Sequence, residues 1–148
     1  MNQAMIQLIS GMVGVLGFSI VFGVRPRLLP WAVLGGGIAC LIMLLCQPLQ
    51  LFAANAAAAF GMTVYCECMA RIKKVPVVGL MIPSITVLVP GSALYYTVSY
   101  LLARNNALAG AYAWSTATIC LGIAAGVLVA SVCVSATLAL HVKVARKN

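Results

Sequence analysis

The only acidic residue of the chain, Glu67, lies in an apolar stretch and precedes Arg71 by four residues. A carboxylate on a membrane helix is costly, and it usually marks an ion path, a proton relay or a substrate contact. The same i, i+4 spacing, with the acid first, also favours a plain ion pair. A carboxylate that exchanges Arg71 for substrate or proton during a cycle satisfies both interpretations, so both stay open.

A second group of residues surrounds two prolines, Pro83 and Pro90, in an uncharged run. Each internal proline removes one helix hydrogen bond, and we expect the two to divide the run. Gly91 supplies backbone freedom, and Ser92 is predicted to cap a new helix. A half-helix that begins inside a bilayer presents unpaired N–H groups, which bind anions without any charged side chain. Such broken helices are typical of transporter binding sites.

Three further polar side chains lie in apolar surroundings. Tyr95 and Tyr96 follow on the new half-helix, where their hydroxyl groups can face a cavity or belong to an aromatic belt at the membrane interface. Asn55 lies among alanines, and we expect it to form a hydrogen bond between helices in place of a ligand contact.

The sequence lacks the side chains that common enzyme mechanisms need. Hydrolysis by paired carboxylates needs two acids, and the chain has one. A zinc site needs three or four ligands, and the only histidine is His141. The six cysteines lie in apolar stretches without a CxxC motif and are interpreted as packing residues. We predict no enzyme activity, no cofactor and no metal.

The composition indicates an integral membrane protein. The chain has 148 residues, of which 64% are hydrophobic and 7% charged, whereas about a quarter of the residues of a soluble domain are charged. Nine basic residues separate the apolar segments and do not gather on one amphipathic surface, so a nucleic-acid partner is not expected. The sequence predicts a single all-α transmembrane domain over residues 1–148.

The uncharged runs predict five transmembrane helices. The first lacks the basic n-region of a signal peptide and is expected to be retained. It carries Gly11, Gly14 and Gly17 as a face for close helix contact, and Gly122 and Gly126 form a GxxxG element in the fifth. The fourth helix is the one broken by proline. The predicted spans cover about 6–24, 28–46, 49–70, 75–103 and 111–140.

The basic residues predict the orientation of these spans. With the N-terminus outside and the C-terminus inside, eight of the nine bases are cytoplasmic and only Arg104 is outside. If the fourth run were a re-entrant hairpin, the ratio would be six to three, so five crossings agree better with the positive-inside rule. An odd number of spans that starts outside suggests a partner of opposite orientation.

Several motifs resemble one transporter family. They are Glu67-x-x-Ala70-Arg71, Lys74-Val75-Pro76, Ile82-Pro83, Leu88-Val89-Pro90-Gly91-Ser92-x-x-Tyr95 and Phe22-Gly23-Val24-x-Pro26. Together they are similar to the C-terminal membrane module of the threonine/serine exporter family. That module also occurs alone, as the small subunit of two-component exporters that include one implicated in succinate export.

The resemblance implies a small subunit that needs a larger five-span partner of the same family. The partner would have the opposite orientation, as in transporters built from inverted repeats. The implied substrates, which are hydroxylated amino acids or dicarboxylates, all carry a carboxylate, and the implied location is the bacterial cytoplasmic (inner) membrane. The residues expected to bind substrate or couple transport to a proton or cation are Glu67, Arg71, Pro83, Pro90, Gly91, Ser92, Tyr95 and Tyr96.

Two other functions remain open from the sequence. A structural membrane scaffold without substrate contact is consistent with the glycine- and alanine-rich helix faces. A proton-coupled small multidrug transporter is consistent with a lone membrane glutamate and would act as a homo-oligomer.

Overall fold

The computed structural model describes residues 3–46 and 48–145, with side chains described up to residue 137. Every regular element in this part of the chain is helical, which confirms the all-α prediction. His141, Lys143, Arg146 and Lys147 lie beyond the described side chains. The elements are α1 (Gln3–Val21), α2 (Leu29–Leu45), α3 (Leu51–Lys73), α4 (Val78–Ile85), the 3₁₀ helix η1 (Thr86–Leu88), α5 (Gly91–Leu102) and α6 (Asn106–Ala145).

Length and composition allow three or four of these helices to cross a membrane. α1, α3 and the Asn106–Thr137 part of α6 are long and apolar enough. The segments Val78–Leu88 and Gly91–Leu102 qualify together as one span, but they are bent by 53°. α2 is apolar and has only 17 residues. Five crossings therefore require α2 to span the bilayer too.

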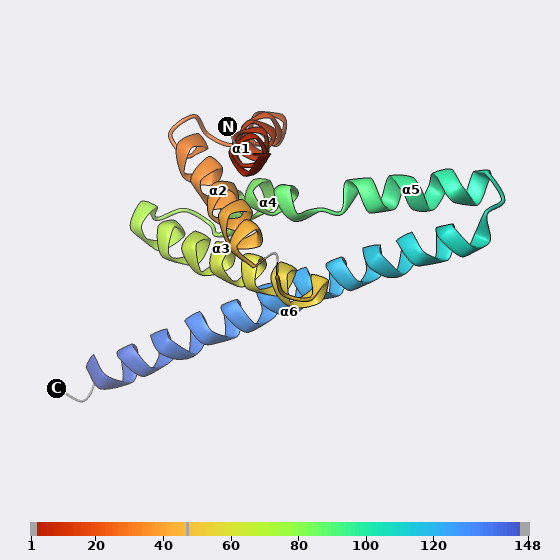
Figure 1. Cartoon of the computed structure of the whole chain (residues 1–148). Helices are drawn as coiled ribbons and strands as arrows, with labels where there is room; N and C mark the ends of the chain where they lie inside the picture. The colour runs from red at the N-terminus through yellow and green to blue at the C-terminus, as the bar shows by residue number, and fades with distance from the viewer. Residues whose placement is uncertain (1–2, 47, 146–148) are drawn as a thin grey trace.

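The helices form a bundle and a projecting hairpin (Figure 1). α1 to α4 gather around a common core, whereas α5 extends away from them and α6 returns along it. The core is built largely of small side chains from α2 and α3, with Met62, Leu80 and Leu88 as its largest members. α6 is one continuous helix, as expected, and its most extensive contact is with α3.

Two glycines of α2 bring three helices together. A Cβ atom at Gly36 would lie 2.5 Å from Val15 of α1, and one at Gly35 would lie 2.6 Å from the Ser84 hydroxyl oxygen of α4. The predicted contact face of α1 is wrong in part, because nothing lies within 4 Å of a Cβ at Gly14 or Gly17. α1 instead packs residues spaced four apart, because the i±4 rows of a helix form its packing ridges; these residues are Gly11, Val15 and Ser19.

The predicted GxxxG element makes the closest contact between α3 and α6. A Cβ atom at Gly122 would lie 2.7 Å from the carbonyl oxygen of Phe52, and one at Gly126 would collide with that of Ala56. Backbone atoms cannot move aside as a flexible side chain can. Only glycine therefore permits this spacing, as in close-packed membrane helices generally.

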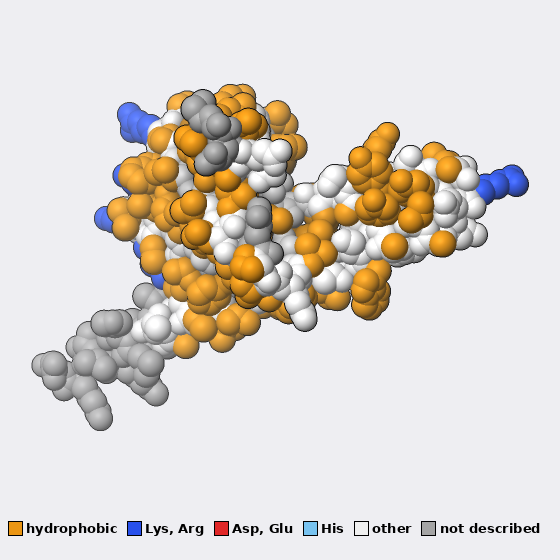
Figure 2. Space-filling view, in the orientation of Figure 1, with side chains coloured by type: hydrophobic (Ala, Val, Ile, Leu, Met, Phe, Trp, Pro, Cys, Tyr) orange, Lys and Arg blue, Asp and Glu red, His pale blue; other side chains and the backbone are white. Residues whose placement is uncertain are grey.

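The described basic residues lie at two places. Five belong to the connection between α1 and α2 or to the last turn and C-cap of α3, and Lys73 lies over the ring of Trp31 at 4.2 Å, which joins the two regions. Figure 2 shows these cations along one edge of the bundle and one more at the tip of the hairpin, where the connection between α5 and α6 carries Arg104. The five residues at the edge are Arg25, Arg27, Arg71, Lys73 and Lys74.

Candidate functional site

Glu67 and Arg71 form an ion pair on the last turns of α3. The Arg71 guanidinium donates to the Glu67 carboxylate at 2.9 Å. The carboxylate side chain is 14% exposed and the guanidinium 42%. The plain ion pair expected from the i, i+4 spacing is therefore present, at the basic end of the bundle.

Pro83 does not divide the run, contrary to the prediction. It lies inside α4 and is buried. A proline within a membrane helix is tolerated where neighbouring polar groups compensate for the missing hydrogen bond. Beside it, the buried hydroxyl of Ser84 has two carbonyl acceptors in reach, Leu80 at 2.7 Å and Ala32 of α2 at 2.9 Å. The latter contact connects α4 to the bundle.

The helix breaks at Pro90. Val89 is extended, as expected for a residue before proline, and its N–H donates to the carbonyl of Thr86 at 3.3 Å. That carbonyl is the one that Pro90 leaves without its usual donor. On its other side, Pro90 lines an apolar cavity of about 580 Å³ between the break and α6, together with Ile123 and Val127.

Ser92 is not the cap of α5, which corrects the sequence prediction. Pro90 occupies the N-cap position and no side chain caps the helix. Because the helix begins directly after Pro90, Ser92 falls within its first turn. Its N–H and that of Ala93 have no backbone acceptor among the described residues. Gly91 and Ser92 are both exposed, so the rest of the described chain leaves this helix end uncovered.

The tyrosines of α5 divide between two surroundings. Tyr96 packs against Tyr112 of α6 with ring centroids 5.3 Å apart, and Tyr100 stacks on the same ring at 5.5 Å. These rings hold the hairpin together. Tyr95 is 68% exposed and touches the edge of Tyr96. Neither Tyr95 nor Tyr96 borders any of the cavities described in this section.

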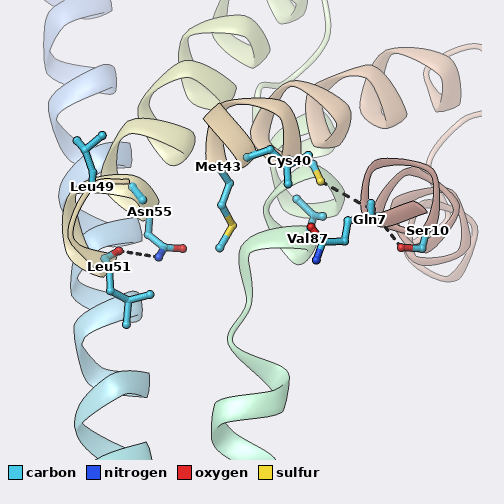
Figure 3. A pocket seen from close by; sticks show the side chains of 11 residues that line it. Gln7, Ser10, Cys40, Met43, Leu49, Leu51, Asn55 and Val87 are labelled. Carbon is cyan, nitrogen blue, oxygen red and sulfur yellow. Dashed lines mark hydrogen bonds between the residues drawn. The ribbon is translucent and has the colours of Figure 1, made fainter. Parts of the chain in front are cut away.

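The predicted site residues therefore do not form one cluster. Glu67 and Arg71 pair at the end of α3, Pro83 is in the core, and the remaining residues lie at the break or on the hairpin. None of the eight lines the cavity of about 680 Å³ that lies between α1, α2, the start of α3 and η1. Its polar lining comes from Gln7, Ser10, Cys40 and Asn55 (Figure 3).

Asn55 is the buried polar group of this cavity. Its Nδ2 donates to the carbonyl of Leu51, one turn earlier on α3, at 2.8 Å. Its Oδ1 is buried and has no hydrogen-bond partner in the part of the chain that the structure describes. The expected hydrogen bond between helices is therefore wrong. Figure 3 shows the amide oxygen directed away from Leu51 and toward Met43, across the cavity.

Sequence reasoning missed Gln7, Ser10 and Cys40 as members of a site. Gln7 and Ser10 are polar residues near the start of α1, and Cys40 resembles a packing residue of α2, so no local pattern connects them. Of these cavity residues, only Asn55 could be singled out from the sequence, because it is a carboxamide among alanines in a predicted membrane span. Its partner could not be inferred because that depends on which helix faces it.

One comparison with known proteins identifies a family. Residues 7–133 match the family model described as Threonine/Serine exporter, ThrE. No curated protein and no solved structure matches the chain. The family match covers all the helices that form the bundle and most of the hairpin. The chain therefore belongs to the threonine/serine exporter family.

Proposed function

We propose that this chain is the small subunit of a secondary exporter and works with a larger five-span membrane subunit of the same family. Membership of an exporter family supports membrane transport of a small molecule. The proposed solutes are small carboxylate-bearing metabolites, either threonine and serine or dicarboxylates such as succinate. The proposed location is a bacterial inner membrane.

The observation that best supports a partner subunit is the uncovered surface of α5. None of its residues is buried, and it carries exposed polar side chains at Ser92, Tyr95 and Ser99. The N–H groups of Ser92 and Ala93 in its first turn also have no backbone acceptor within the described ranges. Lipid cannot satisfy backbone donors, and each unsatisfied group costs several kcal/mol. A protein neighbour that covers α5 removes this cost.

The proposed topology has five crossings, with α2 as a short span and the pair α4 and α5 as one broken span. The N-terminus is outside. The five described cations at the edge of the bundle support this orientation, because basic residues concentrate on the cytoplasmic side. Arg104 at the hairpin tip is then the one base outside.

The proposed roles of the site residues follow from these positions. Glu67 and Arg71 lie at the cytoplasmic end, where the pair can open and Arg71 can receive a solute carboxylate. The free N–H groups beside Pro90 and Gly91 offer a second anion contact once the partner excludes water. Tyr95 and Tyr96 then lie next to the interface with the partner.

Co-expression tests this function directly. Cells that express the chain with a five-span family member are expected to release threonine, serine or succinate into the medium, and cells that express either chain alone are not. Export unchanged in both Glu67→Gln and Ser92→Ala would remove these residues from the transport route. Full transport by the purified chain alone in liposomes would favour the homo-oligomeric multidrug transporter, against which the Glu67–Arg71 pair already weighs.

A further inference from the structure

The cavity lined by Asn55 contains an acceptor that the fold leaves unused. Because Nδ2 donates to the Leu51 carbonyl, the amide cannot be turned around without placing two oxygens against each other. Oδ1 is thereby held on the side that faces Met43 and the cavity (Figure 3), with almost no surface of its own accessible to solvent. A buried acceptor without a partner destabilises a protein, and native structures contain few of them. A ligand that donates a hydrogen bond to Oδ1 relieves this destabilisation.

Two other polar lining residues, Ser10 and Cys40, direct their own protons at the protein and so favour ligand donors. The Ser10 hydroxyl donates a hydrogen bond to the backbone carbonyl of Gln7 at 3.1 Å. The Cys40 thiol is directed at the same carbonyl, with the sulfur atom 3.8 Å from the oxygen. The Ser10 oxygen is therefore left as an acceptor. A ligand with ammonium or hydroxyl protons fits these groups.

None of the described residues that line the cavity is charged, which limits the net charge of its ligand. Apart from the polar groups, its walls are apolar side chains such as Met43, Leu44 and Val87. A dianion would lose its hydration there without gaining a counter-ion, and this is costly in an apolar environment. A zwitterion keeps its two charges balanced within itself. The volume of about 680 Å³ lies in the range of small-molecule sites.

The position of the cavity along the bundle indicates the side on which it opens. Asn55 and Glu67 are twelve residues apart on α3, about 18 Å along the helix axis. The cavity thus lies at the end of the bundle opposite the five cations. If the proposed orientation holds, this is the outer side of the membrane.

We propose that this cavity is an outward-facing solute site, in which Asn55 Oδ1 accepts a hydrogen bond from the ammonium or hydroxyl group of a zwitterionic amino acid. Dicarboxylates are excluded from it. The site rests on the proposed export function for its direction and for the set of solutes from which its ligand is chosen. It narrows the proposed solutes to those without net charge and adds a contact remote from Glu67 and from the helix break.

Chemical protection of Cys40 tests the site. The other five cysteines are replaced with alanine, the chain is co-expressed with its partner, and membrane vesicles are treated with a small water-soluble methanethiosulfonate. We expect Cys40 to react and threonine to slow the reaction. Succinate and sodium chloride are expected to have no effect. No protection by threonine, or equal protection by succinate or sodium ion alone, overturns the proposal.

Two isosteric variants of α3 separate binding from packing. Asn55→Leu removes the acceptor and is expected to weaken protection by threonine about tenfold or more, as for loss of a hydrogen bond to a charged group. Thr63→Val is the matched control, because Thr63 Oγ1 is also buried without a partner but does not line the cavity. It is expected to retain full protection. Loss of protection in both variants, or in neither, contradicts the site.

The midpoint of thermal unfolding distinguishes a binding role of Asn55 from a structural one, because the two roles predict opposite shifts. Asn55→Leu removes an unsatisfied buried acceptor together with the hydrogen bond to the Leu51 carbonyl, and the two effects oppose each other, so its midpoint is expected to stay level or rise while protection is lost. A fall in the midpoint would indicate that Asn55 holds the fold. If Asn55→Leu does not assemble, Asn55→Ala replaces it. The protection of Cys40 by threonine, compared with that by succinate in the chain with Asn55 intact, still tests the proposed site.

Solute export tests the proposed function and threonine protection of Cys40 tests the site, so the two proposals can fail independently. Absence of export with the partner, together with threonine protection of Cys40, would overturn the proposed function and leave the site. Normal threonine export by Asn55→Leu would overturn the site and leave the function.

Discussion

The hydroxyl oxygen of Ser84 in α4 lies 2.9 Å from the carbonyl oxygen of Ala32 in α2. This contact is made where Gly35 has no side chain, since a Cβ atom there would lie 2.6 Å from the same hydroxyl. A glycine of one helix and a serine of the next thus determine how the segment before the break meets the bundle.

Replacing Gly35 with alanine is expected to displace Ser84 and destabilise the protein by about 1–3 kcal/mol, as in other overpacked cores. Gly14→Ala is the control, because nothing lies within 4 Å of a Cβ at Gly14. It is expected to stabilise α1 by about 0.5–1 kcal/mol through helix propensity. Thermal unfolding of the two variants in the same detergent measures the difference, and equal midpoints would contradict the packing described.

The contact of α6 with α3 is expected to fail in Gly122→Ala and in Gly126→Ala. Each added methyl group meets a backbone carbonyl of α3 that cannot rotate away. We expect a loss of about 1–3 kcal/mol or more for each variant. Gly110→Ala, in the same helix but with open space around it, is expected to be neutral or stabilising. A midpoint in Gly126→Ala as high as in Gly110→Ala would disprove the close contact.

Thr63→Val is expected to stabilise the protein by about 1 kcal/mol, because it removes a buried hydroxyl without a hydrogen-bond partner. Thr116→Val provides the comparison. The Thr116 hydroxyl donates to the Tyr112 carbonyl at 2.9 Å, so its loss brings no such gain. Chemical unfolding of the two variants should place Thr63→Val above the unmodified protein and Thr116→Val at or below it.

Glu67→Gln is expected to change stability by less than about 1 kcal/mol, because the pair with Arg71 is partly exposed and such pairs contribute little. Under the proposed function it lowers export about tenfold or more, as for loss of a charged hydrogen bond. Export measured beside thermal unfolding separates the two effects. Normal export would leave the pair as a structural feature only.

Much of the helical layout follows from the sequence, because uncharged runs and basic connections limit where helices can begin and end. α3 and α6 extend a few residues beyond their predicted spans, and α6 remains a single helix. The contact at Gly122 and Gly126 is predictable because the GxxxG spacing places two glycines on one face of a helix, where another helix can approach closely.

The contacts that depend on tertiary packing were not predictable. Pro83 continues its helix and Ser92 does not cap one, since neither proline nor serine determines a boundary alone. Gly14 and Gly17 face away from the bundle because α1 packs through a different row of residues. The Asn55 cavity joins residues from distant parts of the chain, and no sequence spacing connects them.

The closeness of α3 and α6 also restricts how the molecule can change shape. Rotating α6 by one residue would bring Leu121 or Ile123 against the Phe52 carbonyl, where only a hydrogen atom fits. Sliding along the axis meets the same obstacle at Ala56. We therefore expect α3 and α6 to move as one rigid body during a transport cycle, and the relative displacement to fall on α1, α2 and the segment that follows Pro90.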